Sequence, residues 1–303
     1  MTLVVFGLGY SSEAFCRRVR GRFPRIVGTV RSAEKAAALA GVADAVRVWP
    51  GPADEAAPAQ ELAGDLADAE ALLVSVPPGP AGDPVLAAFA EAIAAAPRLR
   101  WIGYLSTIGV YGDHDGAWID ETTPPRPASA RSRERLSAEE GWLALGRRSG
   151  VPVAIVRLAG IYGPGRGPFA KLRAGTARRI VKPGQVFNRI HVEDIAAILE
   201  ASLDRPRAGA VYNGADGAPA PPEDVLAFAA ELARLPVPPA VPFEQADMTP
   251  MARSFYGENK RVACPLLASE LGLTLRFPDY RAGLRAVAEA ESAGGRTDRP
   301  PGR

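Results

Sequence analysis

The sequence predicts an α/β fold in which a doubly wound parallel sheet carries helices on both faces and is followed by a smaller C-terminal lobe. Short continuous apolar runs, such as residues 3–6 and 153–158, are typical of parallel strands that are buried on both faces. Between these runs lie stretches in which apolar residues recur every three or four positions, as on the buried side of a helix. Regular alternation of the two patterns through the first half of the chain predicts a parallel sheet.

The elements follow one another in a simple order. The first strand is expected at residues 3–6, and a helix follows it with Phe15 and Val19 on its buried side. Another apolar run, at 71–76, stops at Pro77 and Pro78, because proline cannot donate a hydrogen bond to a strand ladder. Further strands are expected at 25–30, 45–49, 101–105 and 153–158, and further helices at 33–39, 53–69, 85–96 and 130–148.

After Tyr162 the alternation loosens and proline and glycine become frequent. Helices are still expected at 192–203, 222–234 and about 280–289, and one or two late segments are expected to return to the sheet. We therefore divide the chain into a first domain at 1–165, a region at 166–291 that is mainly a substrate lobe, and a disordered tail rich in Gly, Pro and Arg at 292–303.

Composition limits the classes of function. The 303 residues are 47% hydrophobic, which suffices for a large core, and 36 basic against 34 acidic side chains give a formal net charge of +2. This balance disfavours nucleic acid or an anionic membrane surface as partners. Two cysteines and two histidines are too few for a disulfide framework or a finger-type zinc site, and we expect no metal. We see neither a membrane span nor a signal peptide in the sequence and expect a cytoplasmic protein.

A glycine-rich turn follows the first strand. Gly7 permits a tight turn, and the absence of a side chain at Gly9 lets a pyrophosphate approach the backbone. The helix that follows offers unpaired N–H groups to the phosphates, and Ser12 stands where the usual fingerprint has its third glycine. The turn predicts a Rossmann-type dinucleotide-binding domain in which Gly7, Gly9, Tyr10, Ser11 and Ser12 bind the cofactor.

The end of the second strand indicates which dinucleotide binds. The acidic residue that would accept the ribose hydroxyls of NAD is absent there, and Arg31 and Ser32 follow instead. The planar guanidinium of Arg31 suits a 2′-phosphate, and Ser32 adds a hydroxyl donor. We therefore favour NADP(H) over NAD(H), although a merely solvated surface arginine is the alternative.

Three segments resemble the extended and atypical branches of the short-chain dehydrogenase/reductase superfamily, which include the NAD-dependent epimerase/dehydratase-like proteins. They are residues 105–112, 157–165 and 189–194, which match the signatures of strand five, strand six and the segment before the next helix. The resemblance implies that Thr107 is the catalytic hydroxyl, and it allows a homodimer, because many relatives pair through helices that flank strand five. It also implies further cofactor-lining residues, namely Val76, Pro77, Ser106, Ala159, Gly160 and Ile161.

The chain departs from this family at its centre. The family places a tyrosine and a lysine four residues apart on the helix after strand five, and counting back from Glu139 puts Arg131 and Arg135 there. No tyrosine occurs between Pro124 and Gly150. Arginine keeps its proton, so Arg131 cannot be the general acid or base, whereas Arg135 can still place charge near the cofactor ribose.

The proton donor must then come from elsewhere. Tyr111 and His114 follow strand five, where ligands of open α/β sheets bind, and acidic neighbours on either side would tune His114. The alternatives are an ordered water as donor, a packing role for Tyr111 and a solvated loop around His114. Arg157 and Arg189 are considered for an anionic group of the substrate, but the resemblance assigns neither.

These observations favour an NADP(H)-dependent oxidoreductase acting on an unknown small-molecule carbonyl or hydroxyl substrate. The alternative is an NADP(H)-binding sensor or scaffold that has lost catalysis, which the arginines at the tyrosine and lysine places support. A weaker alternative is a nucleotide-sugar epimerase or dehydratase. The missing tyrosine argues against it, because those reactions begin by removing a proton from a sugar hydroxyl.

Overall fold

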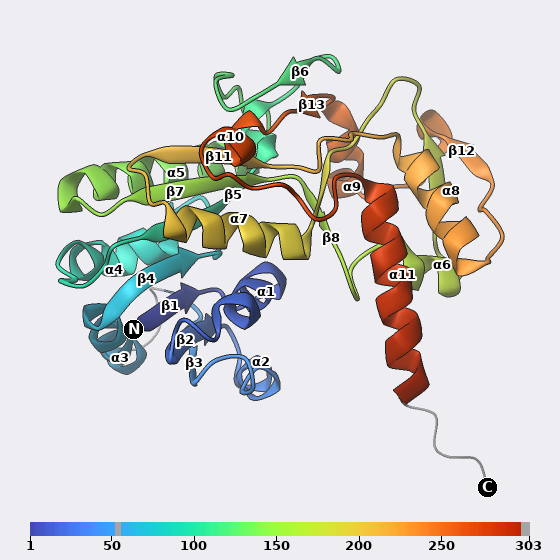
Figure 1. Cartoon of the computed structure of the whole chain (residues 1–303). Helices are drawn as coiled ribbons and strands as arrows, with labels where there is room; N and C mark the ends of the chain where they lie inside the picture. The colour runs from blue at the N-terminus through green and yellow to red at the C-terminus, as the bar shows by residue number, and fades with distance from the viewer. Residues whose placement is uncertain (52–55, 298–303) are drawn as a thin grey trace, which may run out of the picture.

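Seven parallel strands form the central sheet of the computed structural model, which describes residues 1–51 and 56–297 (Figure 1). The strand order is β11-β7-β5-β4-β1-β2-β3, so the winding reverses between β1 and β4. The predicted α/β class with a doubly wound sheet is confirmed. The strands are β1 (Thr2–Phe6), β2 (Arg25–Val30), β3 (Ala45–Val48), β4 (Ala69–Val74), β5 (Ile102–Thr107), β7 (Val153–Leu158) and β11 (Ala210–Gly214).

Helices cover both faces of this sheet, and a separate apolar core lies under each layer. On one face Phe15 of α1 and Ile198 of α7 are fully buried. On the other face Leu62 of α3, Phe89 of α4 and Trp142 of α5 are buried, and Asp83 caps α4 while accepting from the Trp142 indole at 3.1 Å. The covering helices are α1 (Tyr10–Val19), α2 (Ala33–Ala38), α3 (Ala56–Ala67), α4 (Pro84–Ala94), α5 (Ala130–Ser149) and α7 (Val192–Asp204).

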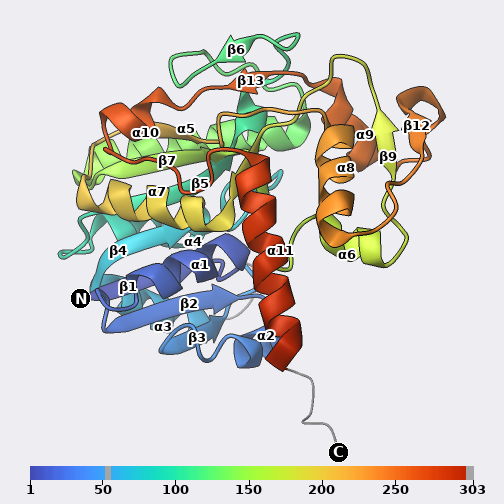
Figure 2. The same ribbon diagram turned by 45° about the vertical axis from the view of Figure 1, so that its right-hand side comes forward.

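A smaller lobe stands beside the carboxyl ends of the strands, with its own core around Phe169, Val225 and Leu284. Helix α11 runs between this lobe and the helices α1 and α7 (Figure 2). The lobe and its connections comprise β8 (Gly160–Tyr162), α6 (Pro168–Arg173), β9 (Arg179–Val181), β10 (Arg189–His191), α8 (Pro222–Ala233), β12 (Ala240–Pro242), α9 (Pro250–Ser254) and α11 (Tyr280–Thr297). Helix α10 (Pro265–Ser269) packs on the sheet domain beside β11. Short elements complete the chain: η1 (Ile108–Tyr111), β6 (Trp118–Ile119), η2 (Phe243–Gln245), η3 (Phe255–Gly257) and β13 (Arg261–Val262).

The chain does not divide cleanly at residue 165. After β10, helix α7 packs against α1, and β11 joins the free edge of β7 in the main sheet. Arg18 and Arg22 near the end of α1 pair with Glu200 and Asp204 of α7. The region after 165 therefore contributes both to the lobe and to the sheet domain.

Two expected boundaries need correction. Strand β4 ends at Val74 rather than 76, because Pro77 and Pro78 restrict the backbone and lack N–H groups. The tail expected to be disordered from 292 begins inside α11, which continues to Thr297 although Gly294 and Gly295 are poor helix formers; just before this segment, Glu291 pairs with Arg173 of α6. Residues 298–303 of that tail and 53–55 of the expected third helix lie outside the described residues.

No helix in the described ranges has both the length and the apolar character needed to cross a membrane. The same residues contain no group of three or more His, Cys, Asp or Glu placed to hold a metal ion.

Candidate functional site

A cleft of about 1420 Å³ lies between the carboxyl ends of the sheet strands and the lobe. Tyr10, Ser75 and Thr107 line it from the sheet side, and Arg189 and Leu226 line it from the lobe. This is the edge at which open α/β sheets bind ligands, beside the point where the strand order reverses. The cleft is therefore the candidate site.

The turn after β1 has the geometry of a phosphate cradle. Gly7 has φ +86°, its N–H donates to Thr29 Oγ1 at 2.9 Å, and a Cβ here would stand 3.1 Å from the backbone nitrogen of Val76. Gly9 precedes α1 in an extended conformation and provides no side-chain cap, so the first N–H groups of the helix remain available to a ligand. The chain thus brings backbone close to backbone where only glycine fits.

The three residues that follow have different roles. Tyr10 donates from its hydroxyl to Pro164 O at 2.9 Å, Arg166 lies 5.5 Å from its ring centroid, and burial raises its pKa to about 12. Ser11 lines the cleft from the first turn of α1. Ser12 is fully buried, and its Oγ has no hydrogen-bond partner among the described residues. Tyr10 therefore joins the glycine turn to the loop after β8, and Ser12 packs inside.

Arg31 and Ser32 lie directly after β2, outside the lining of the cleft. Arg31 is exposed, and Ser32 caps α2 by accepting from the backbone N–H of Lys35 at 3.3 Å. Strand β2 ends at Val30 with no carboxylate at its end. The Arg31 guanidinium, which has no hydrogen-bond partner among the described residues, thus follows the strand at the place where an NAD-binding chain would carry an acidic residue.

The expected cofactor walls lie on both sides of the glycine turn. Val76 covers Gly7 and is half-buried, while Pro77 is exposed and lines the cleft. Ala159, Gly160 and Ile161 line it from the end of β7 and from β8. Pro77, Ala159, Gly160 and Ile161 therefore line the same cleft as Tyr10 and Ser11, whereas Val76 packs over the glycine turn.

Thr107 ends β5 and begins the short helix η1. Its Oγ1 accepts from the backbone N–H of Gly109 at 3.1 Å, which fixes the side chain in the cleft lining. The Oγ atoms of Thr107 and Ser132 lie 3.4 Å and 3.0 Å from the point where a Cβ on Gly109 would stand. Two hydroxyls are thus gathered at this place, and the second, on α5, was not among the residues predicted from the sequence.

A buried ionic network lies behind this pair. Ser106 donates to Glu139, which also accepts from Arg157 Nη2 at 2.7 Å. The exposed fraction is 1% for Glu139 and 6% for Arg157. Arg157 therefore neutralises Glu139 inside the protein, and its guanidinium is not free for an anionic group of the substrate, for which it was considered.

Tyr111 is fully buried and does not line the cleft. Helix η1 directs the Tyr111 side chain into the core on one face of the sheet. There its hydroxyl donates to Asn213 Oδ1 at 2.9 Å, and its ring centroid lies 4.8 Å from the Arg157 guanidinium. Burial raises the pKa of its hydroxyl. We therefore withdraw Tyr111 as proton donor, and its packing role is the one the structure supports.

His114 also lies away from the cleft lining. Its Nε2 is 3.1 Å from Tyr111 O, and its backbone N–H donates to Asn259 O at 3.0 Å. Asp113 in turn accepts from the N–H of Asn259. These hydrogen bonds hold the loop against the segment before β13, so it is not a freely solvated loop. His114 is not placed to donate a proton in the cleft, and we no longer assign it that role.

Two arginines occupy the places counted from Glu139. Arg135 lines the cleft and donates from Nη1 to Leu105 O at 2.8 Å and to Tyr104 at 3.2 Å. Arg131 is exposed, one position from Ser132, with Nη1 4.0 Å from Met251 Sδ of α9. Helix α5 therefore presents two permanent cations to the cleft and no tyrosine.

Comparison with known proteins gives a consistent result. Residues 86–215 match the family described as the NAD dependent epimerase/dehydratase family. Protein YeeZ of Escherichia coli strain K12 is 33% identical over 219 residues, which cover 71% of this chain and 74% of that protein. A solved structure of a functionally unknown conserved protein from Silicibacter pomeroyi DSS is 52% identical, with a TM-score of 0.86 and coverage of 96% of this chain and 98% of that one.

The structure of dTDP-glucose 4,6-dehydratase from Bacillus anthracis in complex with NAD is also similar. It has a TM-score of 0.75 with 98% of each chain covered, but only 16% identity. At this identity the likeness concerns the fold alone.

Proposed function

Because the chain belongs to the NAD dependent epimerase/dehydratase family, we propose that it is an NADP(H)-dependent oxidoreductase acting on a carbonyl or hydroxyl group held in the cleft. The observation that carries the proposal is that Thr107 lines the same cleft as Tyr10 and Ser11, the first residues of α1 after the glycine turn. A Cβ at Gly9 would meet no atom closer than Gly7 O at 4.0 Å, and the uncapped N–H groups of α1 follow directly, which fits a bound pyrophosphate. The dinucleotide, when bound, supplies hydride exchange at its nicotinamide.

The preference for NADP(H) rests on Arg31. This side chain is exposed at the end of β2, and no carboxylate at the strand end competes for a ribose hydroxyl. A guanidinium pairs well with a phosphate through two parallel hydrogen bonds. NADH offers no 2′-phosphate, so it gains nothing from Arg31.

The side chains around Thr107 suit hydride exchange at a carbonyl carbon. Thr107 and Ser132 orient the substrate oxygen by hydrogen bonding, and Arg131 stabilises the negative charge that this oxygen carries in the transition state, in either direction of the reaction. Arginine neither donates nor accepts the proton, because it stays protonated. In reduction, a water molecule in the cleft donates a proton to the oxygen and the hydroxide that forms is neutralised by the solvent; oxidation follows the same steps in reverse.

One observation favours a second function. The places of the family's tyrosine and lysine hold Arg131 and Arg135, and Arg135 is bound to the Leu105 carbonyl rather than free. A protein that binds NADP(H) without turnover, as a sensor or scaffold, needs no proton donor. Epimerase and dehydratase reactions are disfavoured on the same ground, because they need a base at the substrate hydroxyl.

Calorimetry with NADPH and NADH tests the cofactor assignment. Loss of a charge-assisted contact should weaken NADPH binding about 10- to 100-fold in Arg31→Glu, whereas NADH binding should stay the same or tighten, because a carboxylate there can accept from the ribose hydroxyls. Arg98→Glu is the matched control, since Arg98 is exposed in the loop between α4 and β5, at the amino ends of the strands and so opposite the cleft. Equal binding of both nucleotides to the wild-type protein would contradict the NADP(H) preference.

Oxidation of NADPH in the presence of a panel of carbonyl compounds tests the reaction. Turnover that falls at least about tenfold in Thr107→Ala, with NADPH binding retained, supports the oxidoreductase. Full turnover in Thr107→Ala would remove this residue from the chemistry. Tight NADPH binding without turnover on any compound would favour the sensor.

A further inference from the structure

Arg189 is a half-buried cation of the cleft that has no anionic partner among the described residues. It lies on β10, and its Nη1 donates to the carbonyls of Phe187 at 2.9 Å and Ala220 at 3.2 Å. Within the described residues its Nε and Nη2 make no hydrogen bond, and no carboxylate oxygen approaches within 4.0 Å. Two parallel N–H donors are therefore left over on one edge of a fixed guanidinium.

The surroundings of this guanidinium are mainly apolar and aromatic. Tyr162, Ala220, Val225 and Tyr280 pack together in the core of the lobe, and Tyr162 and Val225 line the cleft together with Arg189. Burial here lowers the pKa of Arg189, but arginine still keeps its proton at neutral pH. A charge in such a place is costly unless it is paired, which makes it a strong site for an anion.

The nearest buried carboxyl group compensates this charge poorly. Asp216 is 4% exposed, its Oδ1 accepts from the N–H of Ala218 at 3.1 Å, and its Oδ2 has no partner among the described residues. Burial, together with the charges of Asp279 and Asp194, raises the pKa of Asp216 to about 7 although Arg189 lowers it. At neutral pH the Asp216 carboxyl is thus partly protonated, so the guanidinium is only partly balanced.

We propose that the Nε and Nη2 edge of Arg189 binds a carboxylate of the substrate, whose apolar part lies against Val225 and Leu226 of α8. The proposal rests on the proposed function only in taking the cleft as the substrate site. A carboxylate matches the two donors in geometry and carries one negative charge. A phosphate dianion is disfavoured, because Asp216 already places negative charge beside Arg189 and Asp279 adds negative charge near Asp216.

Calorimetry of the cofactor-free, full-length protein with hexanoate as the probe tests this site. Hexanoate offers a carboxylate and a short apolar chain, and acetate and inorganic phosphate serve as comparison ligands. We expect hexanoate to bind more tightly than acetate or phosphate and to lose at least about tenfold in affinity in Arg189→Met. Arg189→Lys, which keeps the charge but not the two parallel donors, should lose affinity as well.

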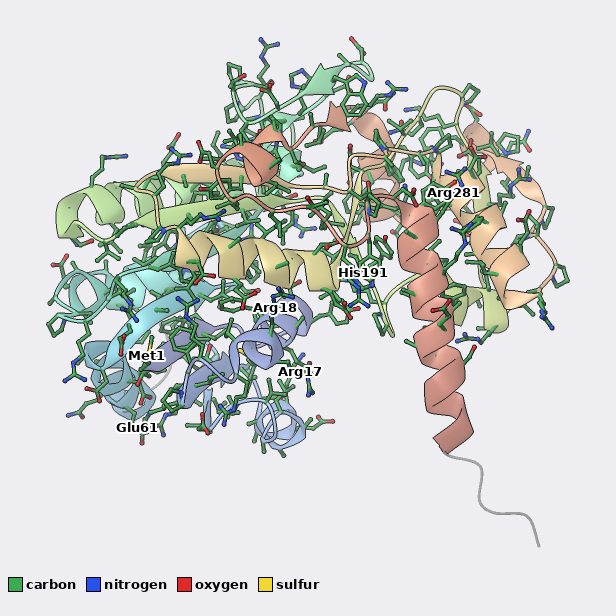
Figure 3. All side chains as sticks on the ribbon, in the orientation of Figure 1. Met1, Arg17, Arg18, Glu61, His191 and Arg281 are labelled. Atoms are coloured by element: carbon green, nitrogen blue, oxygen red, sulfur yellow. The ribbon has the colours of Figure 1, made fainter. Side chains whose placement is uncertain are left out.

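Arg281→Met is the matched control. Arg281 is exposed on α11, stacks 4.6 Å from the Tyr280 ring centroid and does not line the cleft (Figure 3). The same charge is removed from the same lobe, and hexanoate affinity should be unchanged. A comparable loss in Arg281→Met would show a general charge effect and overturn the assignment.

Asp216→Asn supplies a change in the opposite direction. The amide oxygen can still accept from Ala218, while the negative charge that competes for Arg189 is gone. Hexanoate binding at pH 8, where the Asp216 carboxylate is mostly ionised in the wild type, should therefore tighten several-fold, by an amount that shrinks toward pH 6. The groups that share this region are Asp194, Asp279, Tyr162, Tyr256 and Tyr280.

Three results would overturn the proposal: no hexanoate binding to the wild type, unchanged binding in a folded Arg189→Met or Arg189→Lys, and weaker binding in Asp216→Asn. Stronger binding of phosphate than of hexanoate would contradict the carboxylate assignment. Because no nucleotide is present, these results are separate from a failure of NADPH to bind. Carboxylate binding without NADPH binding would retain this site and reject the proposed cofactor.

Discussion

Glutamine in place of Glu139 removes one charge from the buried pair with Arg157 and changes little in shape. The wild-type carboxylate accepts three hydrogen bonds from Arg157, at 2.7 Å and twice at 3.2 Å, and one from Ser106. Breaking a buried ion pair by removing one partner costs about 3–5 kcal/mol, because the other charge is left uncompensated. The glutamine oxygen still accepts part of these bonds, so we expect a loss of about 3 kcal/mol in the free energy of unfolding.

Urea unfolding followed by tryptophan fluorescence measures this loss, with Trp142 as a buried reporter on the same helix. Glu140→Gln is the control, since its exposed side chain has no ion-pair partner among the described residues, and it should change stability by less than about 0.5 kcal/mol. The double variant Glu139→Leu with Arg157→Met should recover most of the loss, because the pair is then replaced by apolar side chains. A cost below about 1 kcal/mol for Glu139→Gln would refute the reasoning that the buried arginine depends on this carboxylate.

Three further predictions concern the packing around the site. Gly283→Ala would place a Cβ against the Tyr162 hydroxyl and 2.6 Å from Cζ of the same tyrosine. Alanine normally stabilises a helix by about 1 kcal/mol relative to glycine, but this clash should outweigh that gain. Chemical denaturation should therefore show a net loss of about 1–2 kcal/mol in the free energy of unfolding. Burial lowers the pKa of His191 to about 4 from 6.5. The contribution of His191 to stability is therefore full above pH 6.5, and it falls by about 3 kcal/mol in all as the pH drops toward 4. The variant His191→Asn, which keeps the helix cap, should flatten that part of a curve of stability against pH. Ser12→Ala removes a buried hydroxyl that has no partner among the described residues and should raise the midpoint of thermal unfolding, so a marked decrease would indicate a partner for Ser12.

The main sheet was largely predictable because most of its strands have a local sequence pattern, a short apolar run. Residues 25–30 and 153–158 form strands with the expected bounds, since each is an apolar run buried on both faces. Strand β11 could not be located in advance. It lies at the sheet edge, mixes Tyr212 and Asn213 into a short run, and pairs with β7, which precedes it by more than fifty residues.

Site residues whose role depends on backbone conformation were predictable from the sequence. Site residues whose role depends on the direction of the side chain were not. Gly7 was readable because a turn of positive φ at a strand end demands glycine. The inward direction of Tyr111 follows from helix η1, which starts only because Thr107 caps it. The cleft position of Ser132 depends on how α5 packs beside η1, and its position in the sequence carries no signal for that contact.

The pairing of α1 with α7 also has a consequence for synthesis of the chain. Arg18 on α1 contacts Glu200 on α7, and β11 closes the edge of the sheet only at Ala210–Gly214. A nascent chain therefore exposes the apolar side of α1 until residue 204 has left the ribosome, long after the glycine turn has been made. We expect a long interval in which chaperones can engage that side of the sheet. Ribosome-bound chains should be captured when only residues before 190 have emerged, and not when residue 214 has emerged.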